Sequence, residues 1–124
     1  MSHFTSLPTR LTDAEILITS LRDLGLVVQT QTEVRGENCQ RLQAEIVAVL
    51  AGGFDLGWTR NPDGTFNLVG DLWGVARKHN QTRLIQAINQ RYVINRTLAQ
   101  AKVTGHRVVA QTVGEGTQRL TLTR

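Results

Sequence analysis

The fold of this chain is decided by residues 54–70, which read FDLGWTRNPDGTFNLVG. Two runs of alternating apolar and polar residues flank the Asn-Pro-Asp-Gly sequence at 61–64, where proline suits the first corner of a type I turn and glycine the left-handed position after it. The apolar residues of each run share one face, made of Phe54, Leu56 and Trp58 in the first run and of Phe66, Leu68 and Gly70 in the second. We therefore predict that residues 54–60 and 65–72 form a β-hairpin.

The sequence before the hairpin predicts an edge strand and then a helix. Residues Phe4–Leu11 favour a strand, and the missing N–H of Pro8 does least harm at a sheet edge. Thr12-Asp13-Ala14-Glu15 is a capping box, in which the threonine hydroxyl caps the helix and the glutamate reaches back. A helix is predicted from Asp13 to Leu24 and ends at Gly25, and its apolar face consists of Ala14, Leu17, Ile18, Leu21 and Leu24.

Short β-rich runs fill the sequence between this helix and the hairpin. We expect strands at Leu26–Val28, Thr30–Arg35 and Ala44–Leu50, because β-branched residues recur there between turn signals. The Gly52-Gly53 pair resembles a phosphate-binding loop, but it lacks the lysine and hydroxyl residue of a P-loop and precedes a strand instead of a helix. We interpret it as the start of a strand.

Residues 80–102 predict a second, longer helix, capped by Asn80 or Thr82. The apolar residues that share one face at about 100° per residue are Leu84, Ile85, Ile88, Tyr92, Leu98 and Ala99. Arg91 and Asn95 fall inside or beside this face, so each needs a hydrogen-bonded partner or an exit to solvent. For Arg91, the expected structural partners beneath the helix are Asp71 and Glu45.

The end of the chain predicts a second hairpin and completes the fold class. Gly105 ends the long helix, and strands at Arg107–Thr112 and Gln118–Arg124 flank a turn at Gly114-Glu115-Gly116. This order of elements predicts an α+β fold, in which both helices pack on one face of an antiparallel sheet. A chain of 124 residues can bury one core, so residues 1–124 are predicted to form a single domain.

The net charge of +4 hides an uneven distribution of charged residues. Acids outnumber bases in residues 1–71, whereas residues 72–114 carry seven basic residues and no acid. Two interpretations are open: the two halves pair within the fold, or the basic segment binds an anionic partner. Exposed cations are common on small proteins, so the charge count alone does not decide between them.

Nucleic acid fits the basic segment poorly. A helix that follows a phosphate backbone aligns its cations on one side, but at about 100° per residue the cations of the second helix do not form one stripe. These cations are Arg83, Arg91, Arg96 and Lys102. Aromatic residues make up only 5% of the chain, which does not favour a base-stacking surface. An acidic protein is therefore the expected partner, with Arg77 and Lys78 as contacts in a predicted loop.

The sequence shows no residue pattern typical of catalysis or of metal binding. Cys39 is the single cysteine, and the three histidines lack the spacing of metal ligands. Asp55 and Asp71 lie on paired strands and could form an acid–base pair, but we interpret Asp55 as solvated or paired with an arginine. We expect no cofactor, metal or catalytic residue. Without a signal peptide or about 18 consecutive apolar residues, a soluble cytoplasmic protein is predicted.

Several short motifs along nearly the whole chain resemble a known family. They are Met1-Ser2-His3-Phe4-Thr5, Val34-Arg35-Gly36, Ala44-Glu45-Ile46-Val47, Phe54-Asp55-Leu56-Gly57-Trp58, Leu68-Val69-Gly70-Asp71, Gln90-Arg91-Tyr92 and Arg119-Leu120-Thr121-Leu122. In this order they are similar to the hypothetical chloroplast reading frame thirty-five family, a domain of unknown function from cyanobacteria and red-algal plastids. The resemblance implies a cyanobacterial cytoplasm or plastid stroma and no known enzymatic activity.

These observations lead to three hypotheses about function. The first is a non-enzymatic accessory or adaptor protein that binds another macromolecule in a photosynthetic cell. The second is an enzyme acting on a small anion, with Arg35, Arg91 and Tyr92 as binding groups, and the third is nucleic-acid binding through residues 72–114. The candidate partner-binding residues are Arg35, Asp71, Trp73, Arg77, Lys78, Arg91 and Tyr92.

Overall fold

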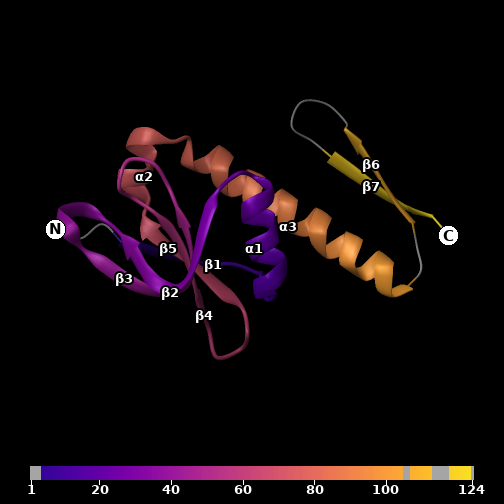
Figure 1. The fold of residues 1–124 in the computed structure, drawn as a ribbon, viewed down its shortest axis with the longest axis horizontal. Helices are drawn as coiled ribbons and strands as arrows, with labels where there is room; N and C mark the ends of the chain where they lie inside the picture. The colour runs from indigo at the N-terminus through magenta and orange to yellow at the C-terminus, as the bar shows by residue number, and fades with distance from the viewer. Residues whose placement is uncertain (1–3, 105–106, 113–117, 124) are drawn as a thin grey trace.

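The protein is seen in a computed structural model that describes residues 4–104, 107–112 and 118–123, with side chains described up to residue 102 except that of residue 78. Five strands form an antiparallel sheet in the order β1-β5-β4-β3-β2, and β6 pairs with β7 (Figure 1). The elements are β1 Phe4–Pro8, α1 Ala14–Asp23, β2 Val27–Arg35, β3 Arg41–Val49, β4 Leu56–Arg60, β5 Phe66–Asp71, α2 Leu72–Lys78, α3 Gln81–Thr104, β6 Arg107–Thr112 and β7 Gln118–Thr123. The predicted α+β class is confirmed.

The predicted hairpin lies at the centre of the sheet. β4 and β5 pair in a register that sets Trp58 opposite Leu68. Gly64 has the left-handed backbone predicted for it, with a φ of 91°, and its N–H donates to the carbonyl of Asn61 across the turn. Leu56 and Trp58 are buried on the same face, as their alternation predicted. The turn and the alternation together therefore fix this register.

One face of the sheet carries the main core, which α1 and α3 cover (Figure 1). The helix residues that are buried in this core are Leu17 and Leu21 of α1, Val75 of α2, and Ile88 and Tyr92 of α3. Burying side chains of this size contributes about 1.5–3 kcal/mol each to folding. The prediction that both long helices pack on one face of the sheet is confirmed.

The first helix begins one residue later than the capping box predicts. Asp13 is the N-cap, and its Oδ1 accepts the N–H of Ile16 at 3.1 Å. The prediction of Thr12 as the cap is wrong, because the Asp13 side chain makes the capping bond. The N–H of Thr12 donates to the hydroxyl of Tyr92, from the other helix. At the opposite end, Gly25 adopts the predicted left-handed conformation with a φ of 79° and ends the helix.

The end of β2 folds over the second face of the sheet. A Cβ on Gly57 would overlap the side chain of Val34, and a Cβ on Gly36 would overlap the ring of Phe4. A smaller apolar cluster forms at this contact, made of Val34, Ala44, Val47 and Val69. β2 is thus one strand of nine residues instead of two, although exposed Gln31, with a φ of 49°, interrupts its pairing without shifting the register.

A short helix that the sequence did not predict follows β5 directly. α2 occupies residues 72–78, where the prediction placed the end of a strand and a loop. Asp71 caps this helix, because its Oδ1 accepts the N–H of Gly74 at 3.0 Å. A Cβ on Gly74 would overlap the ring of Phe54, so the helix lies directly against that ring. Arg77 and Lys78 are therefore helical residues, which corrects their assignment to a loop.

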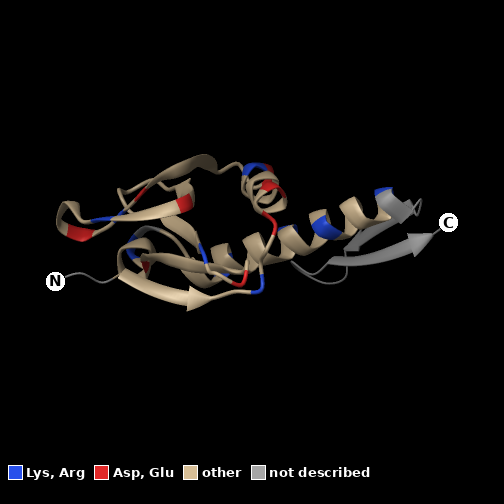
Figure 2. Ribbon diagram, turned by 90° about the horizontal axis from the view of Figure 1, so that it is seen from below, with Lys and Arg blue, Asp and Glu red and all other residues tan. Residues whose placement is uncertain are grey.

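The second long helix, α3, extends well past the sheet (Figure 2). Asn80 is the cap, as one of the two alternatives predicted, and its Oδ1 accepts the N–H of Arg83 at 3.1 Å. Leu98 is 39% exposed and Ala99 is also exposed, although periodicity predicted both on the buried face. They lie on the part of α3 that has left the core, where helical period no longer indicates burial.

Three further predictions concern the ends of α1 and of the chain. Leu24 follows the last turn of α1 and is 37% exposed, so its assignment to the apolar face is wrong. The closing hairpin is confirmed, since β6 and β7 pair from Arg107 opposite Thr123 to Thr112 opposite Gln118. The predicted helix stop at residue 105 and turn at 114–116 lie outside the described residues.

Candidate functional site

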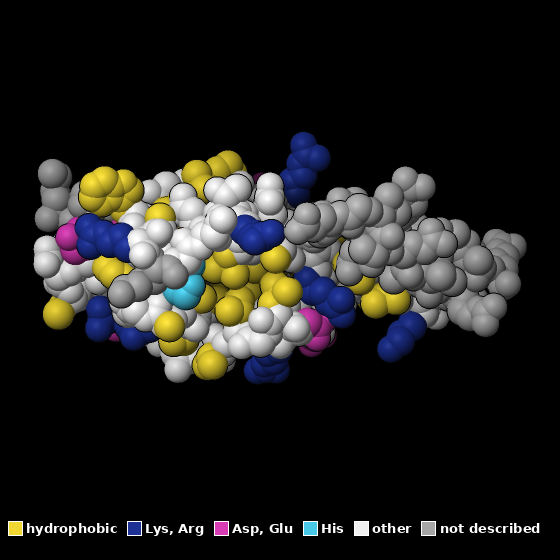
Figure 3. Space-filling model, turned by 90° about the horizontal axis from the view of Figure 1, so that it is seen from above, with side chains coloured by type: hydrophobic (Ala, Val, Ile, Leu, Met, Phe, Trp, Pro, Cys, Tyr) yellow, Lys and Arg dark blue, Asp and Glu magenta, His cyan; other side chains and the backbone are white. Residues whose placement is uncertain are grey.

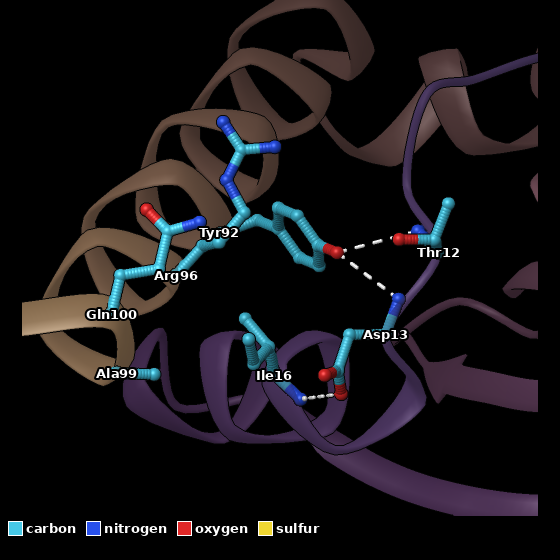
Figure 4. Close-up of a pocket in the computed structure, with 7 residues that line it drawn as sticks. All are labelled: Thr12, Asp13, Ile16, Tyr92, Arg96, Ala99 and Gln100. Atoms are coloured by element: carbon cyan, nitrogen blue, oxygen red, sulfur yellow. Dashed lines mark hydrogen bonds between the residues drawn. The ribbon is translucent and has the colours of Figure 1, made fainter. Parts of the chain in front are cut away.

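Tyr92, one of the candidate binding residues, holds the start of α1 in place (Figure 4). Its side chain is buried between the two long helices, and its hydroxyl oxygen accepts the N–H groups of Thr12 at 3.3 Å and Asp13 at 3.1 Å. N–H groups at the start of a helix have no partner within the helix, so the hydroxyl supplies one. Tyr92 therefore fixes the crossing of α1 and α3.

An open groove of about 420 Å³ lies beside Tyr92 at this crossing (Figure 4). Ile16 and Ala99 give it apolar walls, and Asp13 and Arg96 bring charges of opposite sign to its lining. The Asp13 carboxylate accepts the N–H of Ile16. A lining of mixed charge does not focus one sign of potential on a bound molecule, so this groove is poorly suited to a small anion.

Arg91 faces the far end of α1, where it meets an acid that the sequence did not indicate. The Nε of Arg91 donates to Oδ2 of Asp23 at 2.9 Å, and the Asn95 amide donates to the same oxygen at 3.0 Å. The bonds from Asn95 and then Arg91 lower the pKa of Asp23, because both stabilise the carboxylate. Arg91 and Asn95 thus have the partners that their positions required, but the acid is neither Asp71 nor Glu45.

Arg35 and Asp55 form an ion pair where β2 meets the start of β4. The Nε and Nη2 atoms of Arg35 each donate to the Asp55 carboxylate at 2.8 Å, and the backbone N–H groups of Arg35 and Leu50 donate to it at 3.0 and 3.1 Å. This carboxylate raises the pKa of the Arg35 guanidinium. The interpretation of Asp55 as arginine-paired is confirmed, and its side chain is buried rather than solvated.

Asp71 is also buried, and backbone N–H groups occupy its carboxylate. Oδ1 accepts the N–H of Gly74 at 3.0 Å, and Oδ2 accepts the N–H of Glu37 at 3.1 Å. The second bond joins the end of β5 to the 3-10 turn at residues 37–39. If Asp55 and Asp71 acted as an acid–base pair, each would have to give up contacts that hold the fold.

The remaining candidates lie on α2. Trp73 is 66% exposed, and the guanidinium carbon of Arg77 lies 5.6 Å from the centroid of its ring. The two residues are four positions apart on the helix, which brings their side chains together. Lys78 is the last residue of α2, and its side chain lies outside the described atoms. Trp73 and Arg77 are thus two candidates that the structure brings together.

The structure does not bring Arg35, Arg91 and Tyr92 into one site. Arg35 binds Asp55, Arg91 binds Asp23, and Tyr92 binds the backbone at the start of α1. Among the described residues, no group of three or more His, Cys, Asp or Glu side chains could hold a metal ion. No helix in that part of the chain is long and apolar enough to cross a membrane.

Most basic side chains of α2 and α3 lack an acidic partner within the described part of the chain. The ion pairs there are Arg35 with Asp55, Arg60 with Glu45, and Arg91 with Asp23. The described cations of the two helices that form none are Arg77, Arg83, Arg96 and Lys102. Seen from above, dark blue basic side chains are spread over the surface and magenta acidic ones are fewer (Figure 3). Among the described side chains of α2 and α3, an internal ion pair therefore engages Arg91 alone.

Sequence reasoning missed Gln81 and the position of Arg96. Gln81 is the first residue of α3, and its Oε1 is buried without a hydrogen-bond partner. Its place after Asn80 marks it only as the start of a helix, and nothing local indicates that its amide is covered by other elements. Arg96 was noted only for its charge, and its place at the helix crossing depends on packing between α1 and α3.

Comparison with known proteins places the chain in a family. "Uncharacterized protein ycf35" of Guillardia theta is 33% identical over 126 aligned residues, which cover 100% of this chain and 98% of that relative. This similarity confirms the resemblance carried by the motifs. No solved structure matches the chain. Residues 20–121 match the family described as "Protein of unknown function (DUF1257)". Because these matches cover most or all of its length, the chain belongs to the DUF1257 family.

Proposed function

We propose that this protein is a non-enzymatic accessory or adaptor protein, which binds an acidic partner protein through the basic side chains of α2 and α3. The proposal includes a cyanobacterial cytoplasm or plastid stroma as its setting. The observation that carries it is the set of cations without an acidic partner among the described residues: Arg77, Arg83, Arg96 and Lys102. Exposed cations that the fold does not neutralise attract an acidic surface and speed the encounter with it.

The described acids and hydroxyl groups support this proposal over an enzyme. An enzyme needs a base, a nucleophile or an anion-binding group that faces a substrate. The carboxylates of Asp55 and Asp71 already accept hydrogen bonds from N–H donors, and the Tyr92 hydroxyl accepts two backbone N–H groups. The arginines proposed as anion-binding groups, Arg35 and Arg91, are each paired with an acid.

The distribution of cations supports a protein partner over nucleic acid. At about 100° per residue, Arg83, Arg96 and Lys102 point to different sides of α3, so they cannot follow a single phosphate backbone. The exposed aromatic residue on α2, Trp73, is covered on one ring face by Arg77, which leaves no series of stacking platforms there. A protein surface has no fixed charge spacing, so it can meet cations arranged in this way.

Charge reversal tests the proposal with a matched control. The variant Arg83→Glu, Arg96→Glu, Lys102→Glu should lose partners captured from an extract of a cyanobacterial or plastid-bearing cell, most strongly at low salt. The control Arg10→Glu, Arg22→Glu, Arg41→Glu makes the same change of net charge with exposed residues outside α2 and α3, and it should retain them. Quantitative mass spectrometry of captured proteins gives the readout, and circular dichroism checks that both variants fold.

The outcomes separate the adaptor hypothesis from the nucleic-acid hypothesis. Equal loss of partners from both triple variants would show only a response to net charge and would contradict the proposal. Duplex and single-stranded DNA should bind the parent no more tightly than about 10⁻⁴ M at physiological salt. Micromolar binding to DNA that the α3 variant abolishes would instead support the nucleic-acid hypothesis.

A further inference from the structure

A second groove, of about 450 Å³, lies between β1 on one side and α2 with the start of α3 on the other. Phe4 and Thr5 of β1 line one side, and α2 and the first residue of α3 line the other. The groove is lined by Phe4, Thr5, Leu72, Trp73, Ala76 and Gln81, none of which is acidic. Apolar walls with a few polar groups are the usual lining of a site that binds a side chain or a small ligand.

Gln81 lines this groove and carries an unsatisfied polar atom. Its Oε1 is buried and accepts no hydrogen bond from any described residue. A buried carbonyl oxygen without a donor destabilises a folded protein, so nearly all such groups have a partner. If the Gln81 amide turns toward the groove, a ligand that donates an N–H or O–H group to Oε1 removes this cost on binding. The groove therefore selects a donor-bearing ligand.

Trp73 gives the groove an exposed aromatic wall, and Arg77 places a cation beside that wall. Trp73 is 66% exposed, whereas the other tryptophan, Trp58, is 2% exposed in the core. Tryptophan and arginine are enriched among the residues that dominate binding energy at protein interfaces. The Arg77 guanidinium lies over the Trp73 ring and forms no ion pair among the described residues. The groove is thus complementary to an apolar side chain beside a carboxylate.

Strand addition at the neighbouring edge of the sheet is weakened at its end. The N–H of Thr9 donates to the carbonyl of Phe66 on β5, so in an antiparallel ladder the backbone of Pro8 points the other way, to the open edge. Proline has no N–H to offer there. A partner segment is therefore held by its side chains in the groove, and exposed Leu7, on the same face as Thr5, extends the apolar surface.

We infer that this groove is the docking site for an extended acidic segment of the partner protein. An apolar side chain of that segment enters between Trp73 and Phe4, the Gln81 amide turns so that Oε1 accepts a backbone N–H, and a neighbouring carboxylate pairs with Arg77. This inference rests on the proposed function, because it names the surface by which the acidic partner is recognised. The site depends on Trp73, Arg77 and Gln81. None of these side chains belongs to the main core, so each can be replaced to test the site directly.

The probe is a nine-residue peptide with a central leucine, flanked on both sides by serine and aspartate. In a titration of the ¹⁵N-labelled full chain followed by nuclear magnetic resonance, only two indole N–H signals arise, from Trp58 and Trp73. The Trp73 signal and the side-chain amide of Gln81 should shift with a dissociation constant of about 1 mM or tighter, and Trp58 should stay unmoved. A Trp73→Ala variant assigns the signals by losing one of them.

Two groups of controls, protein variants and altered peptides, separate specific docking from non-specific binding. Trp73→Ala should weaken peptide binding at least about tenfold, and Gln81→Met, which keeps side-chain length but removes the acceptor, about fivefold. Trp73→Ala should leave the melting temperature unchanged, because the side chain is exposed. Peptides in which serine replaces the leucine, or lysines replace the aspartates, should bind more weakly.

Other outcomes would overturn the inference in distinguishable ways. It fails if the Trp73 signal does not move, or if the leucine-free peptide moves it equally. It also fails if the signal shifts with protein concentration alone, since a second copy of the chain would then occupy the groove. Equal capture of acidic proteins by the parent and by Trp73→Ala would contradict the assignment of the groove as the docking site, but not the proposed function. If the peptide binds but no partner protein is captured, the groove is supported as a peptide-binding site and the proposed function is contradicted.

Discussion

Asp55 is the side chain on which the meeting of β2, β3 and β4 depends. Its two oxygens accept bonds from the Arg35 guanidinium, from the Arg35 backbone and from the N–H of Leu50. The residue lies just before β4, where the chain has left β3 and turned back. The buried carboxylate of Asp55 supplies hydrogen bonds where the turn interrupts the strand pairing. It therefore stabilises the fold by joining the ends of β2 and β3 to the start of β4.

Replacing Asp55 with alanine should lower the free energy of unfolding by about 2–4 kcal/mol, because Arg35 and two N–H groups lose their acceptor. Urea denaturation followed by circular dichroism measures this change. Glu33→Ala removes an exposed acid from β2 and should alter the same quantity by less than about 0.5 kcal/mol. Similar small changes in both variants would contradict the role assigned to Asp55.

Asp23 makes stability depend on pH in a definite direction. The contacts with Asn95 and Arg91 keep the pKa of folded Asp23 below its ordinary value of 3.8, so the folded protein binds fewer protons than the unfolded chain in acid. The stabilisation is therefore complete above the ordinary pKa and is lost as the pH falls through the lower folded pKa.

Asn95→Ala should remove much of this effect. The melting temperature of the variant, measured by calorimetry, should lie below that of the parent at pH 7, and the gap should narrow between pH 5 and pH 3. Thr97→Ala serves as a control on the same helix, because Thr97 bonds only to the carbonyl of Val93 within α3. A gap that stays constant across this range would show that Asn95 stabilises the protein independently of Asp23.

At the scale of elements, α2 is the helix that tertiary packing creates. Its seven residues include a glycine and follow a strand without a linker, so neither helix propensity nor period distinguishes it in the sequence. Asp71 was predicted only as a strand residue. Its role as a helix cap depends on Gly74, which packs against Phe54, a contact that the local sequence does not indicate. The longer helices could be predicted because caps, period and length all agree for them.

Gly74→Ala should therefore act against its usual effect on helices. Alanine normally favours a helix over glycine by about 1 kcal/mol, but here the new methyl group would overlap the ring of Phe54. We expect a loss of about 1–3 kcal/mol in the free energy of unfolding, measured by urea denaturation. Arg77→Ala, an exposed change on the same helix, should have little effect. A stabilised Gly74→Ala variant would contradict this packing.

At the scale of the whole molecule, the sequence predicts the sheet but not the way it curls. Alternation and turn residues identify the central hairpin, because both are local. The fold of β2 over the second face depends on Gly57 making room for Val34, two residues far apart in the chain. The candidate site shows the same limit: Trp73 and Arg77 could be selected from the sequence, whereas the groove that adds Gln81 requires three elements to meet.

The charge pattern is also a property of the whole molecule. An uneven sequence allows either internal neutralisation or an outward-facing basic surface, and only the folded arrangement distinguishes them. Arg91 reaches Asp23 because α3 crosses α1 there, whereas the other described cations of α3 form no ion pair with a described acid. Asp55 and Glu45 are meanwhile paired with Arg35 and Arg60 of their own half of the chain.

The two outer strands of the sheet carry a consequence for how the protein behaves at high concentration. β1 presents Pro8 at its open edge, and β2, the opposite outer strand, is interrupted at Gln31. Neither edge offers the long, regular row of N–H and carbonyl groups on which further molecules stack into amyloid-like fibrils. The five-stranded sheet is therefore a poor template for cross-β growth, and fibrils built from its strands would have to begin from unfolded chains.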